Sequence, residues 1–168
     1  MEKVSYLQPS KWRDAIFAGI VLIIVVADQL TKWWIRSSLD INGVLWDAGF
    51  LQIIRINNTG AAFGIFKGHS ITLLIVDIIG IIAILFVIFV LRRRWKFLDS
   101  MWIKTGAGMI VAGTIGNLID RMRFGSVTDW IDIKVWPVFN VADSCVTIGT
   151  IVLAVYLLFI FGRAEKSK

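Results

Sequence analysis

Four long apolar segments alternate with polar stretches along the chain. They lie at about residues 14–35, 71–91, 101–119 and 142–161. At a rise of about 1.5 Å per residue, segments of this length can cross the hydrocarbon core of a bilayer as helices. The pattern predicts an all-α integral membrane protein, built as a single membrane domain with four transmembrane helices.

Two connections, residues 36–70 and 120–141, are too polar to span a membrane. The first contains a run from Phe50 to Gly60 whose β-branched residues partly alternate with polar ones, which predicts a short strand or hairpin. The residues from Asn57 to Gly60 are typical of a turn, because Asn and Gly tolerate positive φ. We therefore expect a small extracytoplasmic β-element at the membrane surface.

Basic residues cluster close to the ends of the apolar segments. Lys and Arg number three in residues 1–13, four in 92–96 and three in 162–168. Since basic residues that flank transmembrane helices tend to stay on the cytoplasmic side, these tracts predict that both termini are cytoplasmic. The two polar connections then face outward together, which brings Asn58 and the aspartates of the second connection to one membrane face.

The start of the chain has a second interpretation. A basic stretch followed by an apolar run is also typical of a secretory signal peptide, and Val25 to Ala27 could serve as its cleavage site. However, the apolar character resumes from Trp33 to Ile35, and further apolar segments follow. This favours an uncleaved first transmembrane helix.

Composition narrows the functional classes. Hydrophobic residues make up 57% of the 168 and charged ones 18%, against roughly 45–50% and about 25% in soluble domains. The net charge of +6 could indicate a nucleic-acid binder, but the basic residues lie where they would face anionic lipid headgroups, so we expect membrane lipid and no nucleic acid as a partner. Cys145 and His69 are each the only residue of their type, so we expect no disulfide within the chain, no metal and no cofactor.

Two local patterns within the apolar segments predict packing. Gly108, Ala112 and Gly116 recur every four residues, which leaves one helix face nearly bare and lets another helix approach closely. Asp28 and Lys32 are spaced to form an ion pair on one helix face. The pair could be structural or functional, and its spacing does not decide between the two.

The polar stretch from Gly113 to Asp143 holds candidate catalytic carboxylates. Polar clusters at a membrane boundary are costly unless they serve a function. Asn140 precedes Asp143 by the spacing of a helix N-cap and its partner, so Asp143 could simply cap a helix, and Asp129 could be a solvated loop charge. Alternatively, the two carboxyls could face each other and share a proton, as in aspartic proteases.

Other nucleophiles are poor candidates. Ser126 and Lys134 could form a Ser–Lys dyad, but the sequence around Ser126 is not a GxSxG motif. A Ser–His pair would need His69, a lone histidine in a connection, where a solvated side chain is the simpler interpretation.

Five motifs in order resemble those of bacterial lipoprotein signal peptidase, also called signal peptidase II: DQLTK from Asp28, NTGAAF from Asn58, GTIGNLIDR from Gly113, VTDWI from Val127 and FNVADS from Phe139. The resemblance covers nearly the whole chain. It implies that Asp129 and Asp143 are catalytic and that Asp28 supports the site. It also implies substrate contacts by five residues, namely Asn58, Gly113, Asn117, Arg121 and Asn140. Thr128 and Trp130 depart from the family, where an aliphatic residue and Phe are common.

The resemblance further implies an aspartic endopeptidase that removes the signal peptide from diacylglyceryl-modified prolipoproteins, on the amino side of the lipidated cysteine. We expect a monomer in the bacterial cytoplasmic (inner) membrane, with its active site facing outward. The substrate would lie in a groove of the third and fourth spans, with the Gly108/Ala112/Gly116 face giving room for its backbone. A proton-coupled transporter would carry acidic residues in mid-span, and an assembly subunit would not need the outer polar cluster.

Asp120 has a separate expected role. It directly precedes Arg121 and lies on the same helix face as Asn117. Asp120 is the nearest counter-charge to Arg121. We therefore expect Asp120 to orient Arg121 or to cap the end of the third span, without touching the scissile bond.

Overall fold

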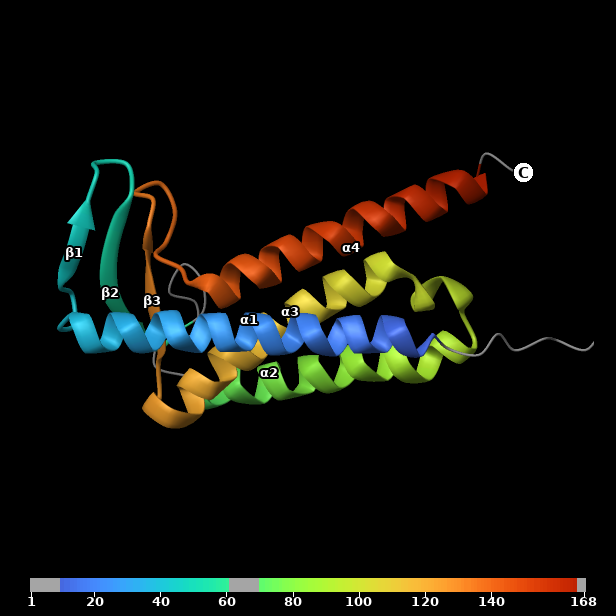
Figure 1. Ribbon diagram of the computed structural model, residues 1–168, viewed down its shortest axis with the longest axis horizontal. Helices are drawn as coiled ribbons and strands as arrows, with labels where there is room; N and C mark the ends of the chain where they lie inside the picture. The colour runs from blue at the N-terminus through green and yellow to red at the C-terminus, as the bar shows by residue number, and fades with distance from the viewer. Residues whose placement is uncertain (1–9, 61–69, 166–168) are drawn as a thin grey trace, which may run out of the picture.

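The computed structural model describes residues 10–60 and 70–165. Within them, the main helices are α1 (Lys11–Ser38), α2 (Ser70–Leu85), α3 (Met101–Phe124) and α4 (Val141–Glu165). They form a bundle with a small sheet at one end, while the start of α1 and the end of α4 lie at the other end (Figure 1). His69, Lys67 and the outermost basic residues of both termini lie outside the described residues.

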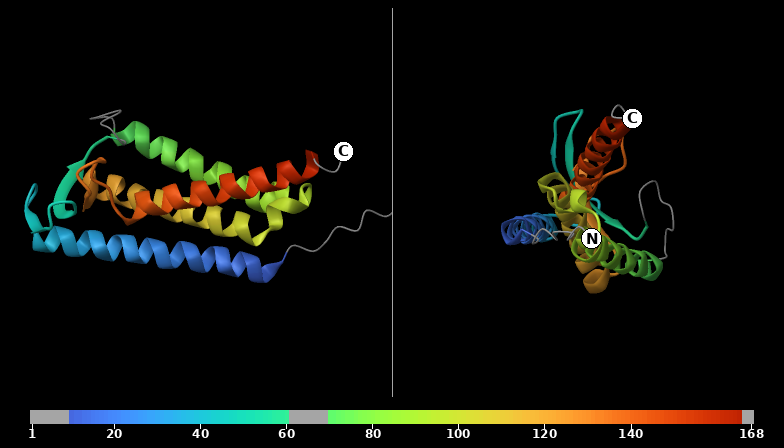
Figure 2. Two further views of the ribbon diagram at one scale, coloured as in Figure 1. Left: turned by 90° about the horizontal axis from the view of Figure 1, so that it is seen from above. Right: turned by 90° about the vertical axis from the view of Figure 1, so that its right-hand side faces the viewer.

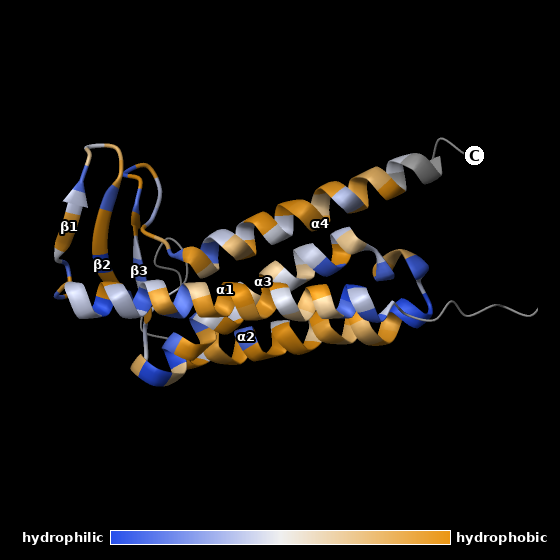
Figure 3. Ribbon diagram, in the orientation of Figure 1, coloured by the Kyte–Doolittle hydropathy of each residue, from blue (hydrophilic) through white to orange (hydrophobic). Residues whose placement is uncertain are grey.

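Three of the described helices are long and apolar enough to cross a membrane. They are Lys11–Ser38, Ser70–Arg93 and Val141–Ile160, the second of which continues from α2 through a π-helical turn, Phe86–Val90, and a 3-10 turn, Leu91–Arg93. A second 3-10 turn, Lys96–Asp99, leads to α3. Hydrophobic residues run along the length of the bundle, and hydrophilic ones gather at its two ends (Figure 3).

The third helix, α3, is the central element and is longer than predicted. It contacts α1, α2 and α4 and buries much of its surface. It continues to Phe124, where Gly125 ends it in a left-handed conformation with φ 70° and donates its N–H to the Arg121 carbonyl. Asp120 and Arg121 therefore belong to α3, which extends beyond the span predicted to end at residue 119.

The sheet has three antiparallel strands in the order β1 (Val44–Asp47), β2 (Gln52–Asn58) and β3 (Val127–Asp132). The strand predicted between Phe50 and Gly60 is confirmed as β2, and it forms a hairpin with β1, which lies before the predicted run. Asn57 and Asn58 belong to the end of β2, and the predicted turn begins only at Asn58, whose side-chain oxygen accepts the N–H of Gly60 at 2.9 Å. Seen from above, β2 crosses the end of the bundle from α1 toward α2 (Figure 2).

The glycines of α3 allow the helices to approach closely, as predicted. A Cβ on Gly108 would lie 3.3 Å from Phe17 of α1. A Cβ on Gly116 would lie 2.5 Å from the carboxylate of Asp28, which also belongs to α1. Because α1 fills this face, the prediction that it gives room for a substrate backbone is wrong. Gly113 faces the other way, and a Cβ there would overlap the backbone carbonyl of Ala142 in α4.

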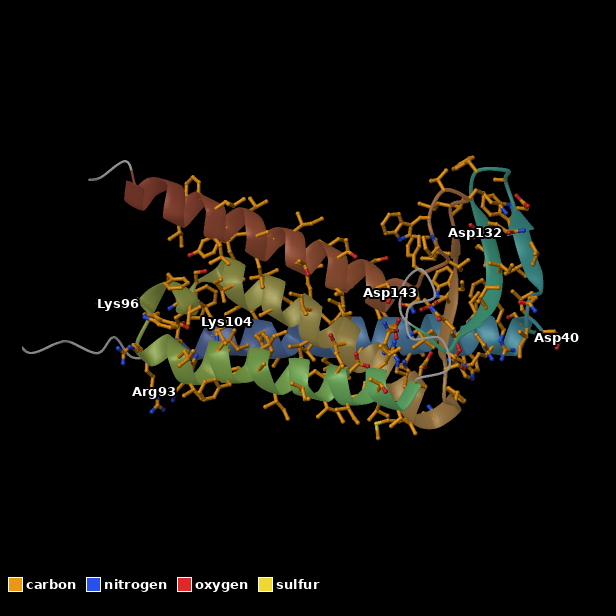
Figure 4. All side chains as sticks on the ribbon, turned by 180° about the vertical axis from the view of Figure 1, so that it is seen from behind. Asp40, Arg93, Lys96, Lys104, Asp132 and Asp143 are labelled. Atoms are coloured by element: carbon orange, nitrogen blue, oxygen red, sulfur yellow. The ribbon has the colours of Figure 1, made fainter. Side chains whose placement is uncertain are left out.

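A buried lysine lies at the end of the bundle opposite the sheet. Lys104 of α3 is 0% exposed. Its Nζ lies 2.8 Å from Asp14 Oδ1 and donates to the carbonyl of Ile88 in the π-helical turn. Figure 4 shows Lys104, Arg93 and Lys96 at this end, and Asp143, Asp132 and Asp40 at the other. Lys104 thus ties α3 to α1 and to the end of the second membrane helix.

Candidate active site

A cavity of about 330 Å³ opens where the sheet meets the bundle. Its walls come from α2, α3, α4, the end of β2, β3 and the segment that leads into α4. The lining residues are Asn58, Gly60, Asp77, Thr114, Asn117, Arg121, Val127, Asp129, Trp136, Pro137, Val138, Phe139, Asp143, Val146 and Thr147.

Asp129 reaches this cavity from β3. The strand pairs with β2, so that Asn58 lies opposite Val127 and Ile56 opposite Asp129. Asp129 is only 2% exposed, and its carboxylate accepts hydrogen bonds from Asn58 Nδ2 at 2.9 Å and from Asn140 Nδ2 at 2.7 Å. The alternative that Asp129 is a solvated loop charge is therefore wrong.

Asp143 lies in the first turn of α4, next to the strands (Figure 4). Its backbone N–H donates to Asn140 Oδ1 at 2.9 Å, and its carboxylate accepts from the Asn140 N–H at 3.2 Å. The predicted N-cap pairing is thus confirmed as a reciprocal capping box. Asn117 Nδ2 donates to the same carboxylate at 2.8 Å. Capping and facing the cavity are compatible roles, because Asp143 does both.

The electrostatic setting of the cavity favours the protonated form of Asp129. Burial, followed by repulsion from Asp143, raises the pKa of Asp129 to about 7, although the hydrogen bonds from Asn58 and Asn140 act in the opposite direction. Like charges disfavour each other's ionisation, so the Asp143 carboxylate adds to the effect of burial on Asp129. Such a pair can both take a proton from water and give one to a carbonyl oxygen.

Arg121 also lines the cavity, but its partner differs from the predicted one. Its Nη1 lies 2.6 Å from Asp77 Oδ2, which reaches across from α2. Asp120 points to the opposite side of α3, where it contacts Lys32 and Arg36. The expectation that Asp120 orients Arg121 is therefore wrong. Asp77 stands out in the sequence as the only charged residue of the second apolar segment. No sequence pattern, however, predicts that it pairs with Arg121.

The remaining candidate residues take supporting positions. Asn140 is 0% exposed and bonds both aspartates. Asp28 forms the predicted ion pair with Lys32 at 2.9 Å, and both side chains are 0% exposed. Asp28 also accepts the N–H of Ala142 at 3.0 Å. Gly113 packs against α4 and does not line the cavity.

The competing nucleophiles lie away from the cavity. Lys134 is exposed just after β3, where its Nζ donates to Gln52 Oε1 at 2.6 Å and lies 3.3 Å from Asp132. Neither Ser126 nor Lys134 lines the cavity. Within residues 10–60 and 70–165, no group of three His, Cys, Asp or Glu side chains is arranged to hold a metal ion.

Comparison with known proteins identifies the family. Residues 20–159 match the family model described as Signal peptidase (SPase) II. The chain belongs to the signal peptidase II family. The family named from the five motifs is therefore confirmed, and the matched residues include Asp28, the Asn58 strand and both cavity aspartates.

Relatives of this signal peptidase II chain are similar over most of its length. A lipoprotein signal peptidase of Dehalococcoides mccartyi is 46% identical over 134 residues, which cover 80% of this chain and 83% of the relative. One of Halothermothrix orenii is 36% identical over 141 residues, covering 82% and 92%. A solved structure of a bacterial membrane enzyme superposes with a TM-score of 0.76 at 32% identity, over 86% of this chain and 88% of that one.

Proposed function

We propose that Asp129 and Asp143 are the catalytic pair of an aspartic endopeptidase. Membership of the signal peptidase II family makes the chain a membrane-embedded protease that removes signal peptides from prolipoproteins. The observation that carries the proposal is the convergence of the two carboxyls on one cavity, with Asn140 bonded to both. Asp77 is the third carboxylate of the cavity wall, and Arg121 neutralises it.

The proposed reaction follows from the unequal settings of the two carboxyls. Asp129, the buried member with the raised pKa, holds the shared proton and gives it to the scissile carbonyl oxygen. Asp143 takes a proton from water, whose oxygen adds to the carbonyl carbon to form a tetrahedral diol. When the C–N bond breaks, Asp143 gives its proton to the leaving nitrogen and Asp129 regains one from a diol hydroxyl.

The cavity suits an extended peptide with an adjacent lipid. Asn58, Asn117 and Arg121 offer polar groups to a backbone that lacks internal hydrogen bonds. Trp136 and Phe139 supply apolar surface on the same cavity. We infer that the substrate is a diacylglyceryl-modified prolipoprotein, cut on the amino side of the lipidated cysteine.

The proposed membrane placement uses α3 as the fourth span. In the bundle, α3 lies among three helices that could each cross a membrane, so it would cross with them. The sheet and the cavity would face outward, and the Arg92 to Lys96 tract would lie in the cytoplasm with both termini. This is a monomer in the cytoplasmic (inner) membrane of a bacterium, in contact with lipid around the bundle.

A reconstituted cleavage assay tests the proposed function. The purified chain in detergent, given only a diacylglyceryl-modified prolipoprotein, should release a signal peptide that ends directly before the lipidated cysteine, as read by mass spectrometry. The same precursor without the lipid should be cut poorly or not at all. Release at another bond, or equal cleavage of both precursors, would contradict the proposed specificity. A transporter or an assembly subunit would release nothing.

A further inference from the structure

A fully buried ionic cluster lies behind the cavity, on the α1 side of α3. The side chains of Asp28, Lys32 and Asp120 are each 0% exposed. Lys32 Nζ lies 2.9 Å from Asp28 Oδ2, 3.5 Å from Asp120 Oδ2 and 2.8 Å from Asn117 Oδ1. An ammonium group has three donors, so this one lysine has a partner for each.

Each carboxylate of this cluster holds the backbone next to one cavity aspartate. Asp28 Oδ1 accepts the N–H of Ala142, the residue before Asp143, at 3.0 Å. Asp120 Oδ2 accepts the N–H of Thr128, the residue before Asp129, at 3.0 Å. Lys32 is therefore linked through Asp28 to the start of α4, which carries Asp143, and through Asp120 to β3, which carries Asp129. These two links are called the two arms of the cluster.

We propose that Lys32 is a positioning residue that fixes the separation of Asp129 and Asp143 by linking the two carboxylates that hold their backbones. The inference rests on the proposed catalytic roles of the two aspartates. Catalysis by a shared proton needs both carboxyls within reach of one water, and a misplacement of about 1 Å can cost roughly 100-fold in rate. Lys32 does not line the cavity, so it does not act on the substrate, and besides the two backbone segments it also holds the side-chain oxygen of the cavity residue Asn117.

The cluster allows the link to be removed without leaving an unpaired charge. Two cations, Lys32 and Arg36, face two carboxylates, and Arg36 Nη1 lies 3.3 Å from Asp120 Oδ1. The double variant Lys32→Met/Asp28→Asn therefore keeps Asp120 paired with Arg36. The new amide oxygen at position 28 can still accept the Ala142 N–H, so both backbone contacts remain, while their connection through Lys32 and the Lys32–Asn117 hydrogen bond are lost.

Lys104 provides the matched control. It is also 0% exposed and lies 2.8 Å from an aspartate, Asp14, but at the opposite end of the bundle. Arg92 contacts Asp14 at 2.7 Å, so Lys104→Met does not leave that carboxylate alone. Loss of this buried lysine should lower the melting temperature and leave kcat per folded enzyme unchanged.

The test measures melting temperature, kcat and KM of the full-length variants in detergent with a diacylglyceryl-modified prolipoprotein. For the double variant we expect a melting temperature close to that of the wild type, kcat lower by about 100-fold, and KM within about threefold of the wild type. A kcat within about threefold of the wild type, or a rise in KM alone, would overturn the proposal.

Two further variants keep the outcome decisive. If the double variant does not fold, Lys32→Gln, which keeps a donor toward Asn117, is measured in the same way, with the same expected loss of kcat. If neither folds while Lys104→Met does, Lys32 serves folding and the proposal fails. Turnover by Asp143→Asn would instead refute the catalytic pair itself, whereas an inactive Asp143→Asn beside a fully active double variant would refute only the role of Lys32.

Discussion

Asn140 joins the two carboxyls of the cavity at the scale of single residues. Its amide donates to Asp129, its side-chain oxygen accepts the N–H of Asp143, and its own N–H donates to the Asp143 carboxylate. The capping half of this arrangement could be predicted from the spacing of Asn140 and Asp143. The other half could not, because Asp129 is placed by the pairing of β3 with β2, which is distant in sequence.

The pKa of Asp129 predicts a pH profile. Because the pair needs one proton, kcat/KM should fall as pH rises through an apparent pKa of about 7. Asn58→Leu removes a hydrogen bond that lowers the pKa of Asp129, so its descending limb should lie at higher pH than that of the wild type. Initial rates at low substrate concentration between pH 5 and 9 would measure the descending limbs of the wild type and of Asn58→Leu. A descending limb that moves to lower pH in Asn58→Leu would contradict the assignment.

The ion pair of Asp77 and Arg121 predicts that a variant of Asp77 affects substrate binding, measured by KM, more than the chemical step, measured by kcat. It holds Arg121 at 2.6 Å on the cavity wall, so Asp77→Asn should let Arg121 move and raise KM, with a smaller effect on kcat. A roughly tenfold rise in KM corresponds to about 1.4 kcal/mol. Asp99→Asn is the matched control, because Asp99 pairs with Arg13 at 2.6 Å at the far end of the bundle. An equal rise in KM in both variants would show that the effect is not local to the cavity.

At the scale of elements, the contact between α3 and α4 determines where Asp143 lies. Gly113 meets the Ala142 carbonyl, one residue before Asp143, with no room for a Cβ. The sequence predicted a glycine-rich helix with close neighbours, since small residues at helical spacing allow that approach. It did not predict which helix covers which glycine, because that depends on how the whole bundle assembles.

Gly113→Ala should therefore destabilise the protein and reduce its activity. Forcing a methyl group into a filled contact typically costs about 1–3 kcal/mol, and here it would push the start of α4 away from α3. Gly19→Ala is the matched control, because nothing lies within 4 Å of its added Cβ, and alanine is favoured over glycine inside a helix by about 0.5–1 kcal/mol. Thermal melting in detergent and cleavage rates would compare the two. A Gly113→Ala variant as stable and active as Gly19→Ala would contradict this account of the helix contact.

The sequence predicts the positions of the apolar helices better than the end of α3 or the strand β3, for physical reasons. Hydropathy located the apolar helices well, because exclusion from water acts on every residue of a span. The polar residues Asp120 and Arg121 predict the start of a connection, but α3 continues to Phe124. They remain helical, since their charges are paired with Arg36 and Asp77 and Gly125 supplies the actual end. Strand β3 was missed because its partner lies far away in the chain.

At the scale of the whole molecule, the polar ends of the bundle differ in kind. One end carries the sheet, and the other carries the Arg92 to Lys96 tract with the start of α1 and the end of α4 (Figures 1 and 4). The cavity lies at the end with the sheet. This separation agrees with the charge pattern of the sequence, in which the basic tracts flank the apolar segments on one side.

Reporter fusions would test the proposed orientation. Fusions after Arg94 and after Lys168 should report a cytoplasmic position, and fusions within residues 40–60 and 124–138 an external one, because the Arg92 to Lys96 tract resists translocation. Activity of paired cytoplasmic and periplasmic reporters, normalised to expression, would measure this. An external signal at Arg94 would place the cavity on the cytoplasmic face and contradict the model of the membrane placement.

The catalytic pair is tested most directly by replacing each carboxyl with an amide. Asp129→Asn and Asp143→Asn keep the shape of the side chain but lose the acid–base function, so each should lower kcat by at least about 100-fold. Because the pKa of Asp129 is raised from 3.8 to about 7, the folded protein holds its proton more tightly than the unfolded one, and this residue costs stability as pH rises between those values. Asp129→Asn should therefore be no less stable than the wild type at pH 8.

The decisive measurement is single-turnover cleavage of a diacylglyceryl-modified prolipoprotein by these two variants, alongside their melting temperatures at pH 8. The account predicts two folded proteins, each without significant release of signal peptide. Turnover near the wild-type rate by either variant would contradict the catalytic pair.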